Sequence, residues 1–191
     1  LQEQRQALFF RLQDDSASAC AQLSACLTLA EQWAGVSQEP AAVPCMEESV
    51  LSFLRSCEVL TSDWKQMLEQ AANAPEPENL LAYTPALDQE IRLFTMDMLY
   101  RYYLRAAYAE TPEAEILPVQ MAAFAVCVVL LCSRRLGFHT AEQRLRIWQL
   151  FVKEIEYDGD NLEELEWQLE TNAAFSPAAF RAYFASLGGV Q

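Results

Sequence analysis

A long apolar run covers residues 116–132, and its middle part, residues 121–132, contains no charged or amide side chain. The run is too long for an ordinary strand and shows no two-residue alternation of apolar and polar positions, so it predicts a helix. Gly137 stands where the C-cap of this helix is expected. Because a helix that is apolar on every side must be enclosed, we expect residues 116–135 to form the central helix of the fold.

The other segments carry apolar residues at the three- and four-residue spacing of amphipathic helices. With only 5 glycines and 8 prolines, this pattern predicts an all-α, single-domain bundle of about seven or eight helices over residues 1–191. Residues 45–73 are compatible with one long helix or with two, since Thr61 can cap a second one. A cluster of prolines predicts an irregular connection at residues 74–86.

Residues 87–108 are expected to form an aromatic-rich helix with a wide apolar side. Spacing places five residues on that side, namely Leu93, Met96, Tyr100, Tyr103 and Leu104. Three more lie beside them, namely Ile91, Phe94 and Met98. An apolar arc of this width implies two neighbouring helices, one of them the central helix.

The central run also has to be weighed as a membrane span. A helix over residues 116–132 rises about 26 Å at roughly 1.5 Å per residue, whereas the hydrocarbon core of a bilayer is about 30 Å thick. Pro118 and Gln120 shorten its apolar part further. A buried core helix is therefore the favoured interpretation, and we expect no membrane partner.

Acidic residues outnumber basic ones by 27 to 13, which gives a formal charge of −14. Nucleic-acid binders need a basic footprint, so this charge argues against DNA or RNA as a partner. It favours solubility or a basic partner. The chain opens with Leu1 rather than Met, which is compatible with a fragment of a longer protein.

The six cysteines do not form a recognisable metal-site pattern. No pair has the spacing C-x-x-C, and His139 is the single histidine, which argues against mixed zinc sites. Buried free thiols in a reducing cytoplasm are the expected state. We therefore expect a cytoplasmic chain that holds neither a metal nor a cofactor.

Acidic residues are concentrated between Glu154 and Glu166. A solvated turn, partly used to cap a helix at Asp160, is the plain interpretation. Glu156 and Asp158, however, fall near the negative end of a predicted helix dipole, where carboxylates are disfavoured. Positions that break local rules in this way are candidates for function.

The second candidate segment is rich in tyrosine and arginine, residue types that protein interfaces use as hot spots. The plainer interpretation places these side chains in the core and on the solvated surface. There is no glycine-rich phosphate loop, G-x-S-x-G or H-E-x-x-H motif, so no catalytic residue is assigned. The candidate functional surface consists of Tyr100, Arg101, Tyr103, Glu154, Glu156 and Asp158.

Four stretches carry a family resemblance. They are Gln4-Arg5 with Arg11-Leu12 before an Ala/Leu-rich helix, Leu99-Tyr100-Arg101-Tyr102-Tyr103, the long apolar helix after it, and Lys153-Glu154-Ile155-Glu156-Tyr157 followed by Asn161-Leu162. Together these stretches resemble the C-terminal helical region of the flagellin lysine-N-methylase family over most of the chain.

The resemblance implies methyl transfer to lysine side chains, flagellin as a protein partner, and an iron–sulfur cluster held by an N-terminal group of cysteines. That cysteine group is absent from this sequence, so no metal-binding or methyl-donor residue is carried over. The first hypothesis is therefore a helical scaffold or substrate-docking portion of a lysine-N-methylase-like bacterial protein, not catalytic by itself. The alternative is a free-standing acidic helical adaptor or small-ligand-binding module without enzymatic activity.

Overall fold

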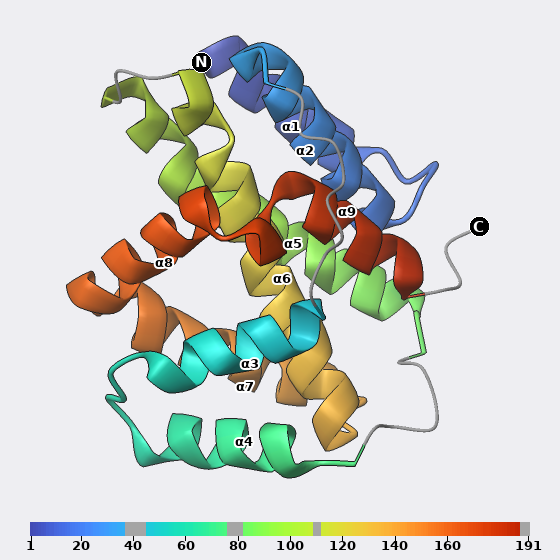
Figure 1. The fold of residues 1–191 in the computed structure, drawn as a ribbon. Helices are drawn as coiled ribbons and strands as arrows, with labels where there is room; N and C mark the ends of the chain where they lie inside the picture. Colours follow the sequence, from blue (N-terminus) through green and yellow to red (C-terminus); the bar gives the residue numbers. More distant parts are fainter. Residues whose placement is uncertain (37–44, 76–81, 109–111, 188–191) are drawn as a thin grey trace.

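The computed structural model describes residues 1–36, 45–75, 82–108 and 112–187 (Figure 1). Within these ranges the chain forms nine α-helices and no strand, which confirms the all-α prediction. The α-helices are α1 (Gln2–Gln13), α2 (Ala19–Ala34), α3 (Met46–Ser56), α4 (Ser62–Asn73), α5 (Pro85–Tyr102), α6 (Leu117–Leu136), α7 (Ala141–Phe151), α8 (Gly159–Thr171) and α9 (Pro177–Ser186). Short helical turns join some of them, namely η1 (Tyr103–Tyr108), η2 (Pro112–Glu115), η3 (Val152–Glu156) and η4 (Ala173–Phe175).

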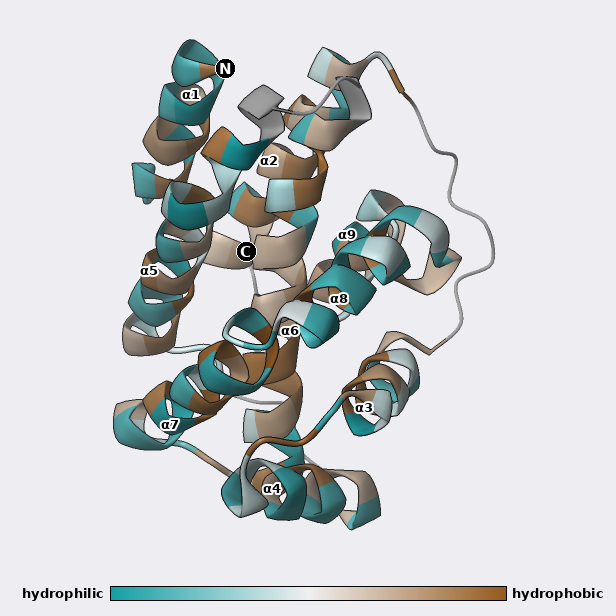
Figure 2. Cartoon of the chain, turned by 90° about the vertical axis from the view of Figure 1, so that its left-hand side faces the viewer, coloured by the Kyte–Doolittle hydropathy of each residue, from teal (hydrophilic) through white to brown (hydrophobic). Residues whose placement is uncertain are grey.

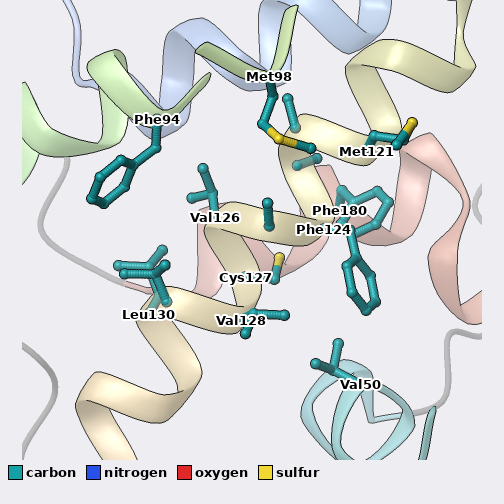
Figure 3. Close-up of a cluster of buried hydrophobic side chains, with 14 of the residues drawn as sticks. Val50, Phe94, Met98, Met121, Phe124, Val126, Cys127, Val128, Leu130 and Phe180 are labelled. Atoms are coloured by element: carbon teal, nitrogen blue, oxygen red, sulfur yellow. The ribbon is translucent and has the colours of Figure 1, made fainter. Parts of the chain in front are cut away.

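Helix α6 runs through the middle of the molecule, and its apolar residues are covered by the surrounding helices (Figures 1 and 2). Every residue from Pro118 to Ser133 is buried. Figure 3 shows apolar side chains that three other helices direct at α6, namely Val50 of α3, Phe94 of α5 and Phe180 of α9. The predicted central helix is therefore confirmed.

Aromatic packing strengthens this core around Phe124 of α6. Its ring lies edge-on to Phe53 of α3, with 5.6 Å between ring centroids, and edge-on to Phe175 of η4, at 5.3 Å. Edge-to-face pairs of this kind add roughly 0.5–1.5 kcal/mol beyond the burial of their area. Phe124 thus ties two segments distant in sequence to the central helix.

Among the described helices, α6 is long and apolar enough to cross a membrane, with a mean hydropathy of 1.8. In the structure, 89% of this apolar window is buried by the rest of the chain. A core helix of this kind passes the same length and composition test, so the test by itself is weak support for a span.

The C-terminal end of α6 has a residue that commonly ends helices, whereas its N-terminal end lacks a side-chain cap. Gly137 ends the helix with φ 65°, a left-handed conformation that suits glycine. At the start, Pro118 lies in the first turn, where its missing N–H costs little. In the sequence, Thr111-Pro112 predicts an N-cap and first helical position for this helix, but Thr111 lies outside the described residues. Ile116 occupies the N-cap position without a side-chain hydrogen bond.

The stretch 45–73 forms two helices, because the chain leaves helical geometry between Ser56 and Ser62. Thr61 caps the second one by accepting a hydrogen bond from the backbone N–H of Trp64. This break raises the helix count above the predicted seven or eight.

The predicted connection at 74–86 is shorter than expected, since Pro85 is already the first residue of α5 and Thr84 is its N-cap. Residues 76–81 of that connection lie outside the described residues.

The buried side of α5 differs from the predicted one. Leu93 and Tyr100 are exposed, by 51% and 68%, and Leu104 in η1 is exposed too. The buried side instead consists of Leu87, Ile91, Arg92, Phe94, Thr95, Met98, Leu99 and Tyr102. The prediction was wrong for Leu93, Tyr100 and Leu104 and correct for Tyr103, Ile91, Phe94 and Met98. The apolar arc of α5 is wider than the side its neighbours cover, and spacing alone does not choose between its two edges.

Helix α7 continues into η3, a π-helical turn in which the backbone N–H of Tyr157 donates to the carbonyl of Val152. π-Turns are rare and occur often at functional sites. Two carboxylates, Glu154 and Glu156, lie within this turn.

Candidate functional site

The six residues of the predicted functional surface do not form one surface. Arg101 and Glu156 form an ion pair although they lie 55 positions apart. The other four have separate environments: Glu154 and Tyr103 are fully buried, Tyr100 is exposed, and Asp158 caps a helix. The six residues therefore do not form the single surface that was predicted, although Arg101 and Glu156 do contact each other.

The ion pair joins the end of α5 to the end of η3. Glu156 Oε2 accepts hydrogen bonds from Arg101 Nη1 and from the Tyr102 hydroxyl, the latter at 2.7 Å. Arg101 Nη2 also donates to Asp97 Oδ2 at 2.6 Å, in the favourable i,i+4 arrangement. A cation and a phenol from α5 thus compensate the unfavourable position of Glu156 at the negative end of its helix.

Burial changes the acid–base chemistry of this cluster. The Glu156 side chain is only 3% exposed, and its Oε1 atom is buried without a hydrogen-bond partner. Burial raises the pKa of Glu156, while the Tyr102 hydrogen bond and the Arg101 charge oppose that rise. Burial and the adjacent carboxylate also raise the pKa of Tyr102, which keeps its hydroxyl protonated as a donor.

Glu154 has a structural role on the opposite side of η3. Its carboxylate accepts hydrogen bonds from the backbone N–H of Leu60, at 2.7 Å, and from the Thr61 hydroxyl. Asn161 completes the attachment of this loop: its side chain bonds the Glu58 N–H and both carbonyls of Glu58 and Glu154. Glu154 therefore fixes the connection between α3 and α4 and is not part of a functional surface.

Asp158 caps α8, with its Oδ1 atom accepting the Asn161 N–H at 2.9 Å. The cap expected at Asp160 was wrong, because the helix starts two residues earlier, at Gly159. Asp160 lies in the first turn and is exposed. The apparent conflict at Asp158 is resolved because it sits at the positive start of α8.

The two predicted tyrosines differ from each other completely. Tyr100 is 68% exposed, whereas Tyr103 is fully buried in the core. Burial raises the pKa of Tyr103, and its hydroxyl has no hydrogen-bond partner. Neither side chain joins the Arg101–Glu156 cluster.

A pocket opens beside that cluster, where η1, the start of α6 and α8 meet. Its volume is about 180 Å³, and it is lined by Tyr102, Arg105, Ala114, Leu117, Pro118, Met121 and Glu166. Tyr102 connects the pocket to the buried ion pair, since its hydroxyl binds Glu156. The pocket has apolar walls and a charged rim.

The rim is formed by Arg105 and Glu166. Arg105 Nη1 lies 2.7 Å from Glu166 Oε1, and the Arg105 guanidinium lies 5.6 Å from the centroid of the Tyr102 ring. Burial raises the pKa of Glu166; Arg105 opposes the rise, and the charges of Glu170 and Glu163 add to it. Burial thus disfavours the charged form of Glu166, and Arg105 is the cation that stabilises it.

The tyrosine- and arginine-rich segment that the sequence indicated as a possible pocket or docking site includes Tyr102 and Arg105. The six residues chosen for the functional surface left out these two and Glu166. Arg105 follows Arg101 by four positions, the spacing that puts two residues on one helix face. That spacing was the one local signal for it. Glu166 could not be distinguished from its acidic neighbours, because only the fold shows which of them faces a pocket.

Two larger hollows are more open to solvent. The first has about 420 Å³ and lies between α3 and the end of α8, lined by Glu48, Ser49, Ser52, Phe53, Ser56, Gln168 and Asn172. The second has about 760 Å³ and lies between the α1–α2 turn and the start of α5. In the second, the Arg92 guanidinium already donates to the carbonyls of Leu12, Asp14 and Ala17. Its strongest donor is thus engaged by the chain itself.

Within the described ranges, no group of three or more His, Cys, Asp or Glu side chains is arranged to hold a metal ion. His139 is exposed, and its backbone N–H donates to the Gln143 side chain within the capping box of α7. Burial raises the pKa of the Cys20, Cys26 and Cys132 thiols to about 12, which disfavours the reactive thiolate.

Comparison of the chain with protein-family models, with curated proteins and with solved structures finds no match in any of the three.

Proposed function

We propose that the chain is a protein-docking module without catalytic activity of its own, whose pocket between η1, α6 and α8 accepts a lysine side chain of a partner. The observation that carries the proposal is the half-buried Glu166 carboxylate at the rim of an apolar pocket, with its pKa raised by burial. A lysine ammonium placed there would share the carboxylate with Arg105 and further stabilise the charged form that burial disfavours.

The size of the pocket favours one side chain over a free metabolite. Small-molecule sites typically have volumes of about 300–1,000 Å³, whereas this pocket has about 180 Å³. A lysine side chain consists of a flexible apolar stem and a compact ammonium. The stem suits the walls formed by Leu117, Pro118 and Met121, and the ammonium suits Glu166.

The family resemblance also suggests a lysine side chain as the group that is bound. Flagellin lysine-N-methylases act on lysine side chains, so a helical portion that docks a lysine fits a substrate-docking role. Flagellin is the partner that the resemblance suggests. The proposal assigns no methyl transfer and no cofactor to the residues of this chain.

Methyl NMR of the chain tests the pocket directly. The probe is Nα-acetyl-lysine methylamide, and its norleucine analogue keeps the stem but lacks the ammonium. Of the 5 methionines, Met121 lines the pocket, while Met46 and Met67 lie on α3 and α4. We expect saturable shifts of the Met121 methyl with the lysine probe, weaker shifts with norleucine, and no shifts at Met46 and Met67.

Two variants make this test specific. Glu166→Gln removes the rim carboxylate and should weaken lysine binding several-fold, whereas Glu69→Gln removes one charge from an exposed residue of α4. Unchanged Met121 resonances, or equal shifts from both probes, would contradict the proposal.

Purified flagellin tests the partner. We expect it to bind the chain before, but not after, chemical acetylation of its lysines, since acetylation removes the charge. Equal binding of both forms would exclude recognition of a lysine.

A further inference from the structure

The outward side of α8 is acidic and carries one exposed aromatic ring. Helical spacing places five exposed residues on this side, namely Asp160, Glu163, Glu164, Trp167 and Glu170. Only Asn161, Leu165 and Leu169 of α8 are buried. We call the five exposed residues the α8 face.

Trp167 is unusual among the four tryptophans. Trp64 is fully buried and Trp148 is 7% exposed, whereas Trp167 is 55% exposed. Tryptophan is enriched among the residues that dominate binding energy at protein interfaces. Its ring also attracts cations that lie over its face. The position of Trp167 is thus better explained by binding than by folding.

The charge of α8 determines what this ring can meet. The helix contains five acidic residues and no basic one, in a chain with a formal charge of −14. A second copy of the chain or an anionic surface would meet strong repulsion there. A positively charged partner is the complementary choice.

The α8 face is continuous with the lysine pocket. Glu166 lies three positions after Glu163 and four before Glu170, the spacings of side-chain neighbours on a helix, and it lines that pocket and pairs with Arg105. A segment lying along α8 can therefore direct one side chain into the pocket while its other cations lie against Trp167 and the carboxylates.

We propose that the α8 face docks a lysine-rich segment of a partner protein, with Trp167 as its aromatic anchor. This inference rests on the proposed function, because it describes the rest of the partner whose lysine enters the pocket. It adds that the partner carries several cations along one segment, and not one isolated lysine.

The test uses a fluorescein-labelled 12-residue peptide of alternating lysine and alanine, titrated with the full chain at about 0.15 M salt. Two triple variants compare positions at equal charge. Glu163→Gln, Glu164→Gln and Glu170→Gln change the α8 face, whereas Glu3→Gln, Glu69→Gln and Glu142→Gln change exposed residues of α1, α4 and α7. Both triples move the formal charge from −14 to −11.

We expect the α8 triple to weaken peptide binding about tenfold and the control triple by less than about twofold. Trp167→Ala should weaken it about tenfold without any change of charge, and Trp167→Phe should retain most of the affinity. Circular dichroism checks that each variant stays folded.

Equal weakening by the two triples would show that only the overall charge attracts the peptide, and would overturn the inference. So would an unchanged affinity for Trp167→Ala. Analytical ultracentrifugation measures the oligomeric state of the natural chain and of Trp167→Ala. If the natural chain is a dimer and the variant a monomer, the α8 face binds a second copy of the chain, which would also overturn the inference.

The two proposals can fail separately. If the lysine probe shifts the Met121 methyl resonance but substitutions on the α8 face do not change peptide binding, the pocket proposal is supported and the α8 inference is wrong. If the peptide requires the α8 face but the lysine probe leaves Met121 unchanged, the pocket fails and a basic partner on α8 remains.

Discussion

Helices α6 and α8 lie in the same fold and have opposite relations to solvent. Every residue of α6 from Pro118 to Ser133 is buried, whereas α8 buries only Asn161, Leu165 and Leu169. Figure 2 shows this contrast in the hydropathy of the two helices. The difference indicates that α6 supplies the stability of the fold, and that α8 can devote most of its surface to a partner.

Replacement of Phe124 should have the largest effect on stability. Its ring is fully buried and packs against Phe53 and Phe175, so Phe124→Ala is expected to lower the free energy of unfolding by about 3–5 kcal/mol. Trp167→Ala should change it by no more than about 0.5 kcal/mol. Urea unfolding followed by circular dichroism measures both, and similar losses would break the contrast between α6 and α8.

The next largest effect is expected at Glu154, an acidic residue like those of α8 that is as fully buried as the residues of α6. Glu154→Ala leaves the Leu60 N–H and the Thr61 hydroxyl without their acceptor; because both hydrogen bonds are partly buried, the loss should cost about 1–3 kcal/mol in total. Glu154→Gln keeps one acceptor oxygen and should lose less. Glu163→Ala, at an exposed position, is the matched control in the same urea unfolding measurement.

A smaller effect is expected at the start of α8. Asp158→Ala removes the side-chain cap on the Asn161 N–H and should cost about 0.5–2 kcal/mol of unfolding free energy. Asp160→Ala, two residues later, should cost less, because Asp160 is not the cap. Thermal unfolding distinguishes them, and a larger loss for Asp160→Ala would place the helix start where the sequence pattern predicted it.

The smallest effect concerns the pH dependence of the Arg101–Glu156 cluster. Burial raises the folded-state pKa of Glu156 above its usual 4.5, so the folded state holds this proton more tightly than the unfolded state. The resulting stability is fully present below about pH 4.5 and is lost as the pH rises through the folded-state pKa.

The direction of this pH dependence can be tested by measuring the unfolding free energies of the natural chain and of Glu156→Gln across this pH range. The natural chain should lose stability relative to the variant as the pH rises, and the difference should level off at both ends. The same comparison with Glu163→Gln, at an exposed site, should show little dependence. A gain of the natural chain with rising pH would mean that Arg101 and Tyr102 outweigh burial.

Local sequence signals identified much of the fold. The apolar run of α6 and Gly137 after it lie where the pattern predicted them. The sequence Thr140-Ala141-Glu142-Gln143 also has the pattern of a capping box, and the structure shows one there. They could be predicted because each depends on residues within one or two turns of each other. The family resemblance and the functional hypotheses built on it remain predictions.

The candidate site was predictable only in part. Glu156 attracted attention because a carboxylate at a helix C-terminus is unfavourable, but its partners Arg101 and Tyr102 lie more than 50 residues earlier. Glu154 and Glu156 belong to one acidic stretch in the sequence. The structure separates them, because residues two positions apart on a helix do not share a face.

The sequence alone determined that the chain is helical, that residues 116–135 lie at its centre, and where several helices end, because propensity, spacing and capping act over a few neighbouring residues. Tertiary structure decided which edge of α5 is buried, that Glu154 holds the α3–α4 connection, and that Tyr102, Arg105 and Glu166 surround one pocket. Helical periodicity defines the angles between side chains on one helix, but it does not define the rotation of that helix against its neighbours. That rotation is set by packing around α6, and the site depends on it.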